Sequence, residues 1–309
     1  MDILWHVGIL IVAGVALTWA ANVVVKQSSS LAQKLGLSSF TIGFLLLGVL
    51  TSTPELFVAI QAASDGIPQL SVGNLLGGSI LLLSLVMGIV AILLGRVSLD
   101  HQLSTGELWA MMGVIAAPIT VLWDERLTRS EGLFLVGVYA LHAFILNRDG
   151  KKGSRKKRAR VAGLGGHLAL LALGVGAMFM SSRLIVTSAE VIMGLFSIAP
   201  IVFGLFFLSL GTNLPELALA YESIRHRRRE IAFGDFLGSS AANTLILGIL
   251  GVIAPFTGGN GRLVGALLLL GSITIYFLWA ISSGRTITRK EGIGLLVFYL
   301  LFVGYELII

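Results

Sequence analysis

Two short segments place a glutamate directly after a proline and four residues after a threonine, inside long apolar stretches. The first runs from Thr51 to Glu55 and reads TSTPE, and the second runs from Thr212 to Glu216 and reads TNLPE. Proline has no backbone N–H, so each segment leaves one helical carbonyl without its donor. Carboxylate, hydroxyl and carbonyl oxygens suit Ca2+, Na+ or protons and suit soft metals poorly. The two segments therefore predict a cation site.

Further oxygen ligands lie beside these segments. Ser52 and Asn213 follow the two threonines. In the apolar run after the second segment, Asp235, Ser239 and Asn243 recur every four residues and therefore share one helix face.

The corresponding stripe after the first segment reads Asn74, Gly78 and Leu82, so its polar side chains disappear with depth. Both stripes begin in a GxxxG pattern, GNLLG and GDFLG, whose small residues let helices approach closely. We expect a lopsided site that takes more ligands from the second half of the chain.

A single glutamate in an apolar span has a simpler interpretation, namely a packed, protonated and hydrogen-bonded side chain. Two glutamates with the same neighbours favour a functional role instead. The five histidines show no ligand spacing and receive no role; they are His6, His101, His142, His167 and His226.

Membrane helices must position these residues. The chain has 309 residues, a mean hydropathy of +0.93, 56% hydrophobic residues and 12% charged residues. Apolar runs of about 20 residues indicate a polytopic membrane protein, and they are too long for the strands of a barrel. No cysteine is present, which excludes disulfides and thiolate metal sites. The amino-terminal run lacks a basic leader and a small-residue cleavage site, so we interpret it as a retained first span.

The pattern predicts an all-α protein with ten transmembrane helices. Their expected limits are 3–25, 39–62, 70–94, 104–123, 132–147, 163–187, 199–221, 231–255, 261–281 and 290–308.

A basic segment, NRDGKKGSRKKRAR, joins the fifth and sixth spans. Lys and Arg beside membrane spans mark the cytoplasmic side, which explains this segment better than nucleic-acid binding does. With ten spans, all of the 22 basic residues fall on the side of this segment except Arg126, Arg129, Arg183 and Arg262. We expect the basic loop to be cytoplasmic and both termini to lie outside, in a prokaryotic plasma membrane.

The two halves of the chain repeat at an offset of 161 residues. The offset takes Glu55 to Glu216, and the match continues without a gap from Gly43 to Ser79. The expected units are a first five-helix repeat, 1–147, a basic linker, 148–162, and a second five-helix repeat, 163–309. Because five is odd, the halves enter the membrane in opposite directions. Inverted repeats of this kind are typical of secondary transporters with a midplane site.

The paired segments resemble the alpha repeats of the sodium/calcium exchanger family, within the cation/calcium antiporter superfamily. That family carries G-T-S-L-P-E in one span and G-[ND]-x-x-G-S-N-x-x-[ND] in the next, once per half. This chain reads VLTSTPE with GNLLGGSILL, and LGTNLPE with GDFLGSSAAN. With ten spans and two repeats, the resemblance covers essentially the whole chain.

The resemblance implies that the motif glutamates bind calcium, that sodium uses overlapping sites, and that spans 1 and 6 slide across the other helices. The implied ligands are Thr51, Ser52, Glu55, Thr212, Asn213, Glu216, Ser239 and Asn243. The family's serine and its second polar position in the first half are Gly78 and Leu82 here. These departures leave the fold and the carboxylate pair intact, while the identity and number of the exchanged ions stay open.

The expected function is secondary active exchange of Ca2+ for Na+ by alternating access. The alternatives are a Ca2+/H+ or other cation/proton antiporter, because two close carboxylates readily hold a proton, and a transport-inactive scaffold. Without an HExxH motif, a convincing Ser–His pair or an intramembrane aspartate partner for Asp235, we expect no enzymatic activity and no cofactor. The expected partners are inorganic cations and the lipid bilayer, with no nucleic acid.

Overall fold

The computed structural model describes residues 3–34, 51–98, 105–149, 164–226, 229–258, 261–282 and 286–308. The first half contains α1 (Ile3–Lys34), α3 (Thr53–Ser64), α4 (Pro68–Ile80), the π-helical turn η2 (Leu81–Val86), α5 (Met87–Leu94), β1 (Arg96–Ser98), α6 (Thr105–Val121), β2 (Arg126–Leu127) and α7 (Arg129–Asp149). The second half contains α8 (Leu164–Phe196), α9 (Pro200–Phe203), the π-helical turn η4 (Gly204–Leu208), α10 (Ser209–Thr212), α11 (Leu214–His226), α12 (Arg229–Ile253), β3 (Phe256–Thr257), α13 (Arg262–Ser282), β4 (Thr286–Thr288) and α14 (Arg289–Ile308).

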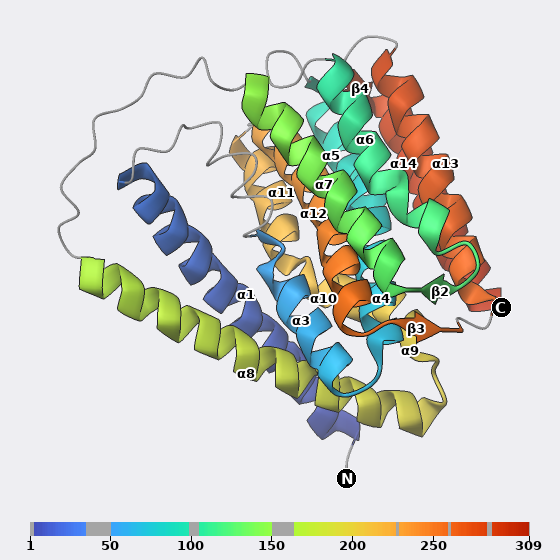
Figure 1. Ribbon diagram of the computed structural model, residues 1–309. Helices are drawn as coiled ribbons and strands as arrows, with labels where there is room; N and C mark the ends of the chain where they lie inside the picture. Colours follow the sequence, from blue (N-terminus) through green and yellow to red (C-terminus); the bar gives the residue numbers. More distant parts are fainter. Residues whose placement is uncertain are drawn as a thin grey trace.

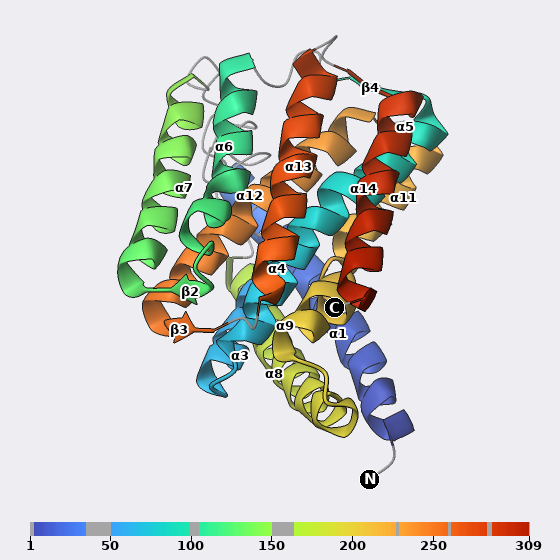
Figure 2. The ribbon, with the colours of Figure 1, turned by 90° about the vertical axis from the view of Figure 1, so that its right-hand side faces the viewer.

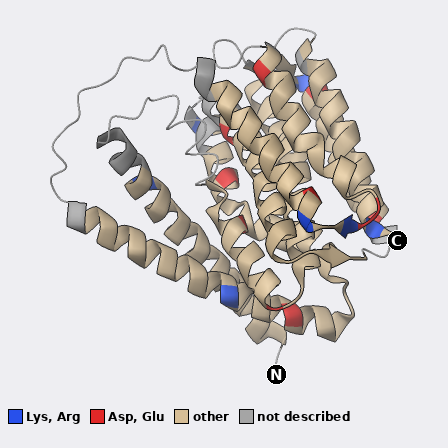
Figure 3. Ribbon diagram, viewed as in Figure 1, with Lys and Arg blue, Asp and Glu red and all other residues tan. Residues whose placement is uncertain are grey.

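Among the described residues, six helices are long and apolar enough to cross a membrane, or seven if the pair α9–α10 and α11, bent by 48°, forms one span. Each of the ten predicted ranges contains a described helix, although the second range is described only from residue 51 onward. Figure 3 shows long stretches of helix without charged residues. The count of ten spans stays a prediction.

Several helices run beyond their predicted limits. Helix α1 continues to Lys34 and α8 continues to Phe196, whereas the hydropathy pattern placed their ends at 25 and 187. Helix α7 reaches Asp149, so the predicted linker begins inside a helix. Residues 150–163, which hold most of that linker, lie outside the described part of the chain.

The buried apolar side chains form two clusters. The larger one unites helices α4–α7 and α12–α14. The smaller one joins α1 and α8 and includes Val58 and Ala62 from α3 and Leu70 from α4. Figures 1 and 2 show α1 and α8 beside each other at the edge of the remaining helices. The protein therefore consists of a helical body and a long two-helix unit.

Two glycine contacts join the halves of the body. A methyl group built on Gly132 of α7 would lie 2.7 Å from the carbonyl oxygen of Gly248 in α12, and one built on Gly292 of α14 would lie 2.9 Å from that of Gly88 in α5. The two contacts are related by an offset of 160 residues. Because only glycine permits these approaches, the last helix of each half packs closely on the other half.

The same offset relates the starts of α7 and α14. The backbone N–H and the hydroxyl of Thr128 both donate to Glu131, at 2.7 Å each, and Thr288 donates in the same way to Glu291, at 2.6 and 2.8 Å. These are capping boxes, which satisfy N–H groups that a helix leaves unpaired at its start. Short antiparallel strands precede both helices: β1 pairs with β4, and β2 pairs with β3.

Candidate cation site

Two helix breaks mark the site. Ser52, directly before α3, has φ −82° and ψ 14°, and Asn213, between α10 and α11, has φ −87° and ψ 16°. These values lie near the sparsely populated bridge region, where many functional residues occur. The two positions are 161 residues apart. Each break lies two residues before the proline of its segment and directs the glutamate that follows into the protein, where Glu55 and Glu216 are each 1% exposed.

A chain of hydroxyl groups reaches Glu216 across the two halves. Ser239 in α12 donates to Oε1 of Glu216 at 3.1 Å, and the Thr51 and Ser239 hydroxyl oxygens are 3.1 Å apart. Either hydroxyl can be the donor in the contact between Thr51 and Ser239. Three of the predicted ligands are therefore connected.

The equivalent threonine in the second half has another partner. Thr212 donates to Oδ1 of Asn74 in α4 at 3.0 Å. Thr212 also lies beside the buried carboxylate of Glu55, but its hydroxyl points to Asn74, and within the described residues neither carboxylate oxygen of Glu55 has a hydrogen bond of good geometry. The two glutamates, although related by the repeat, have different surroundings.

The amides of Asn213 and Asn243 have defined orientations. Nδ2 of Asn213 donates to the Ser209 carbonyl at 2.8 Å, and Nδ2 of Asn243 donates to the Leu75 carbonyl at 3.2 Å. A carbonyl oxygen only accepts, so these contacts identify the nitrogen of each amide. Oδ1 of Asn243 is buried and has no partner in the described part of the chain, which makes it an available cation ligand.

The two amide nitrogens converge on Gly78. A methyl group built there would lie 2.8 Å from Nδ2 of Asn213 and 3.3 Å from Nδ2 of Asn243. The serine that the family carries at this position would therefore collide with Asn213. Asn213 stands where the family motif G-T-S-L-P-E has its serine, so the larger side chain at position 213 and the missing side chain at position 78 compensate each other in volume.

The site concentrates acceptor oxygens that lack donors. Within the described residues, these are both carboxylate oxygens of Glu55, Oε2 of Glu216 and Oδ1 of Asn243. Oδ2 of Asp235 is also buried and unpaired, and Asp235 lies near enough to act electrostatically on both glutamates. Buried acceptors without donors are rare in proteins and call for a bound cation, a proton or water.

Sequence reasoning omitted two polar residues of this region from the ligand set. Asn74 accepts from Thr212, and the Ser79 hydroxyl accepts from Asn243 at 3.2 Å. Asn74 occupies the position equivalent to Asp235 in the repeat, and this equivalence could have identified it as a site residue. Leu82 is fully buried in the larger apolar cluster and supplies no oxygen, as predicted. In the part of the chain that the structure describes, no three acidic or histidine side chains group closely enough to hold a metal by themselves.

Comparison with known proteins identifies the family. The family described as sodium/calcium exchanger protein matches residues 5–147 and 166–307, which is nearly the whole chain. The chain belongs to this family. The resemblance that the motifs indicated is confirmed, as is the prediction of an integral membrane protein.

Several relatives have similar lengths. The inner membrane protein YrbG of Escherichia coli K12 is 28% identical, with 94% of this chain and 92% of YrbG covered. The putative antiporter CaxA of Alkalimonas amylolytica is 29% identical, with 96% of each covered. The sodium/calcium exchanger MaX1 of Methanosarcina acetivorans is 25% identical, again with 96% of each covered.

Solved structures share the fold. The sodium-calcium exchanger NCX_Mj superposes with a TM-score of 0.69 at 20% identity and covers 98% of this chain and 99% of its own. The H+/Ca2+ exchanger CAX superposes with a TM-score of 0.77 at 16% identity, and the match covers 98% of this chain and 82% of CAX. The helical fold is thus that of membrane transporters.

Proposed function

We propose that the protein is a secondary active cation antiporter that exchanges Ca2+ for Na+ by alternating access. The observation that carries the proposal is the group of four unpaired acceptor oxygens on Glu55, Glu216 and Asn243. Two carboxylates from different halves would balance one divalent cation, and the amide and hydroxyl oxygens would complete its coordination. Oxygen ligands of this kind suit Ca2+.

The coupling ion is the finer part of the proposal. Relatives include proteins named as sodium/calcium and H+/Ca2+ exchangers. Sodium is favoured because neutral hydroxyl groups lie beside the carboxylates and Na+ is readily coordinated by neutral oxygen ligands. These hydroxyls belong to Thr51, Thr212 and Ser239. Proton coupling is the second candidate, and the unpaired carboxylate of Glu55 supports it, because a proton would satisfy one of its oxygens.

We further propose ten spans arranged as two inverted repeats, with both termini outside and the central basic loop in the cytoplasm. The reciprocal glycine contacts and capping boxes support the repeat. The start of α1 and the end of α14 both lie toward the lower end of the views in Figures 1 and 2, which agrees with an even number of spans. We propose no enzymatic activity and no cofactor.

Flux measurements in proteoliposomes test the proposal. Vesicles loaded with Ca2+ are diluted into Ca2+-free medium that imposes an inward gradient of either Na+ or H+. The membrane potential is clamped in both assays. Calcium release that depends on Na+ supports the leading proposal, and release that depends only on the pH gradient supports the second. If neither gradient drives calcium release, and Ca2+ does not raise the thermal stability of the purified protein, the transport-inactive scaffold would be the remaining alternative.

A further inference from the structure

An amide group of the second half fills the space beside Gly78 in α4. Nδ2 of Asn213 donates to the Ser209 carbonyl at 2.8 Å and to the Thr212 hydroxyl at 3.4 Å. An amide nitrogen has two hydrogens, so both N–H groups of Asn213 have an acceptor. The same nitrogen would lie 2.8 Å from a methyl group built on Gly78. The oxygens of Ser209 and Thr212 thus already bond to a donor that belongs to the protein.

A second amide approaches the same place from α12. Nδ2 of Asn243 donates to the Leu75 carbonyl and to the Ser79 hydroxyl, at 3.2 Å each, and would lie 3.3 Å from a methyl group on Gly78. Both of its N–H groups therefore have acceptors as well. Oxygens that could coordinate a cation beside Gly78 bond instead to N–H groups, which carry partial positive charge. The two amides thus occupy the place that a cation would need.

The repeat-related position in α12 has different neighbours. An offset of 161 relates three pairs of residues, namely Gly78 and Ser239, Asn213 and Ser52, and Asn243 and Leu82. Neither serine nor leucine carries an amide, so positions 52 and 82 supply no counterpart of the two NH2 groups. The repeat therefore places a hydroxyl in the second half where the first half has a glycine covered by amides.

The oxygens around Ser239 can coordinate a cation. Ser239 donates to Oε1 of Glu216 at 3.1 Å, and the Thr51 hydroxyl lies 3.1 Å from the Ser239 hydroxyl. Oε2 of Glu216 is buried and has no hydrogen-bond partner among the described residues. A hydroxyl that donates its hydrogen still has lone pairs for a cation. One of the two repeat-related positions is thus lined by oxygens, and the other by N–H groups.

Charge also limits how many cations this site can hold. Glu55 and Glu216 together balance one Ca2+ or two monovalent cations. A third monovalent cation would exceed their charge and would need further neutral oxygens, because a buried charge without ligands is costly. A symmetric site would offer such oxygens at position 78 as well as at position 239. In this chain, only position 239 offers them.

We propose that each Ca2+ is exchanged for two Na+, so that exchange is electroneutral, because the amides of Asn213 and Asn243 fill the second monovalent-cation position beside Gly78. This inference rests on the proposed antiporter function. One Na+ would lie beside Ser239 and the other between the two glutamates. The net charge moved in a cycle depends on the cations alone, since the carboxylates of the protein are present in both directions of transport.

The coupling ratio is measured on the unmodified protein. Proteoliposomes receive fixed Na+ gradients, valinomycin with K+ sets the membrane potential, and the Ca2+ gradient at which net calcium flux reverses is recorded. We expect reversal where the Ca2+ concentration ratio equals the square of the Na+ ratio. The reversal point should be the same at inside-positive and inside-negative potentials, because no net charge crosses the membrane. Reversal at another power of the Na+ ratio, or at a point that shifts with potential, would overturn the proposal.

A double variant tests whether the amides set this ratio. Gly78→Ser with Asn213→Ser replaces the nearer amide by a hydroxyl and adds a second hydroxyl on α4. We expect the reversal point to move toward the cube of the Na+ ratio and to depend on potential. An unchanged reversal point in a folded, transporting double variant would show that the place beside Gly78 does not limit the number of Na+. If the double variant does not fold, the measurement on the unmodified protein still decides the coupling ratio.

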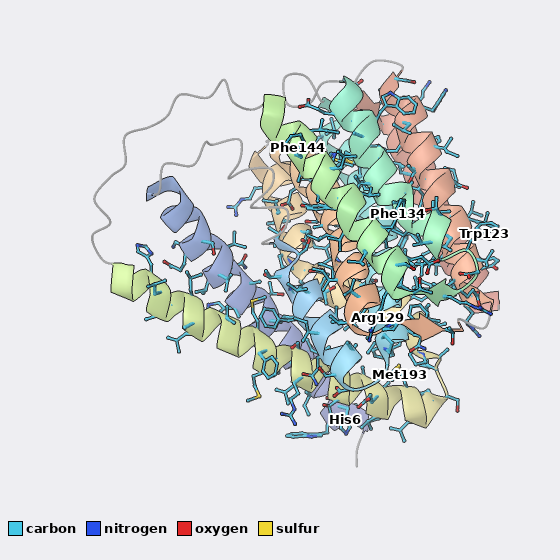
Figure 4. All side chains as sticks on the ribbon, in the orientation of Figure 1. His6, Trp123, Arg129, Phe134, Phe144 and Met193 are labelled. Atoms are coloured by element: carbon cyan, nitrogen blue, oxygen red, sulfur yellow. The ribbon has the colours of Figure 1, made fainter. Side chains whose placement is uncertain are left out.

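The matched control is Gly137→Ser in α7, which adds a hydroxyl to a membrane helix away from the site. Gly137 is exposed, and a methyl group built there would meet nothing within 4 Å. Figure 4 shows α7 on the outer side of the body, where Phe134 and Phe144 are exposed. We expect this variant to keep the reversal point of the unmodified protein, and an equal shift would overturn the assignment to position 78.

The proposed function and this inference fail in different ways. Calcium release that Na+ does not drive at all would contradict the exchange of Ca2+ for Na+. Calcium release that Na+ drives with another coupling ratio would leave that function in place and would contradict only the electroneutral exchange.

Discussion

The Thr51 hydroxyl lies 3.1 Å from the Ser239 hydroxyl, which donates to the carboxylate of Glu216. Thr51 belongs to the first half of the chain, and the other two residues belong to the second. A change in how the halves meet would therefore alter the hydrogen bonding of a proposed ligand. This gives the site a direct connection between cation binding and the relative position of the halves.

A double-mutant cycle measures this connection. Thr51→Val should weaken Ca2+ binding severalfold, and Thr51→Ser should keep it, because serine retains the donor. In a Ser239→Ala background, the additional effect of Thr51→Val should shrink by about 1 kcal/mol, the scale of one hydrogen bond. Calcium titration of the four purified proteins gives the coupling. Fully additive effects would mean that Thr51 does not act through Ser239.

The two glutamates should both be required. Glu55→Gln and Glu216→Gln keep the side-chain size but remove the charge that offsets a divalent cation, so each should abolish calcium-dependent exchange in folded protein. Asp124→Asn is a suitable control, since Asp124 is exposed and accepts from the Arg126 backbone in a turn outside the site. Near-normal calcium flux in either folded glutamine variant would rule out the two-glutamate site.

Because Asn213 occupies space next to Gly78, a smaller residue at position 213 should restore the function that a larger residue at position 78 removes. Gly78→Ser alone should lower thermal stability and flux, because its Cβ would lie 2.8 Å from Nδ2 of Asn213. Combining it with Asn213→Ser should recover much of the loss. The control is Gly113→Ala in α6, where an added methyl group meets nothing within 4 Å. If the double variant has the same thermal stability and flux as Gly78→Ser, Asn213 is not the side chain that the added serine clashes with.

Asn243→Asp should tighten Ca2+ binding at high pH. Oδ1 of Asn243 is unpaired, and a charge placed about 4 Å from a divalent ion contributes several kcal/mol at an effective dielectric near 20, before desolvation. The empty variant should be less stable, since an oxygen would replace the nitrogen that donates to Leu75. As the pH falls, protons should compete with calcium for the repelling carboxylates, which include Asp235, and the gain should fade. Calcium titrations across pH that show no gain at any pH would mean that Asn243 does not face the cation.

The basic loop should be cytoplasmic. A cysteine introduced at Ser154, in the segment outside the described residues, should resist membrane-impermeant reagents in sealed cells, whereas Thr257→Cys in the exposed strand β3 should be labelled from outside. The natural absence of cysteine keeps the background low. External labelling at position 154 would refute the proposed orientation.

The helical elements could be predicted because they depend on local sequence. Apolar runs indicated where helices lie, and the identical neighbours of Glu55 and Glu216 indicated two equivalent segments. The ends of α1 and α8 could not be predicted, because a helix that leaves the membrane loses its apolar pattern but keeps its backbone hydrogen bonds.

The contacts between halves were harder to predict because they depend on tertiary packing. Proline predicted a disturbed helix, but the altered dihedral angles fall on Ser52 and Asn213, two residues earlier. In the sequence, Gly78 indicates only the loss of the family's serine ligand. The structure shows that the amide groups of Asn213 and Asn243 occupy the space a side chain at position 78 would need. His6 and His167 lack ligand spacing in the sequence, and only the structure shows their contacts with Ser188 and Gln27.

At the glycine contacts Gly132–Gly248 and Gly88–Gly292, each half covers a surface of the other half. A fragment ending after α7 would expose the glycine face of that helix to lipid, and a fragment starting at α8 would leave the corresponding face of α12 bare. The two halves, expressed as separate polypeptides, would therefore have to associate through both of these seams before either could cover its glycine face.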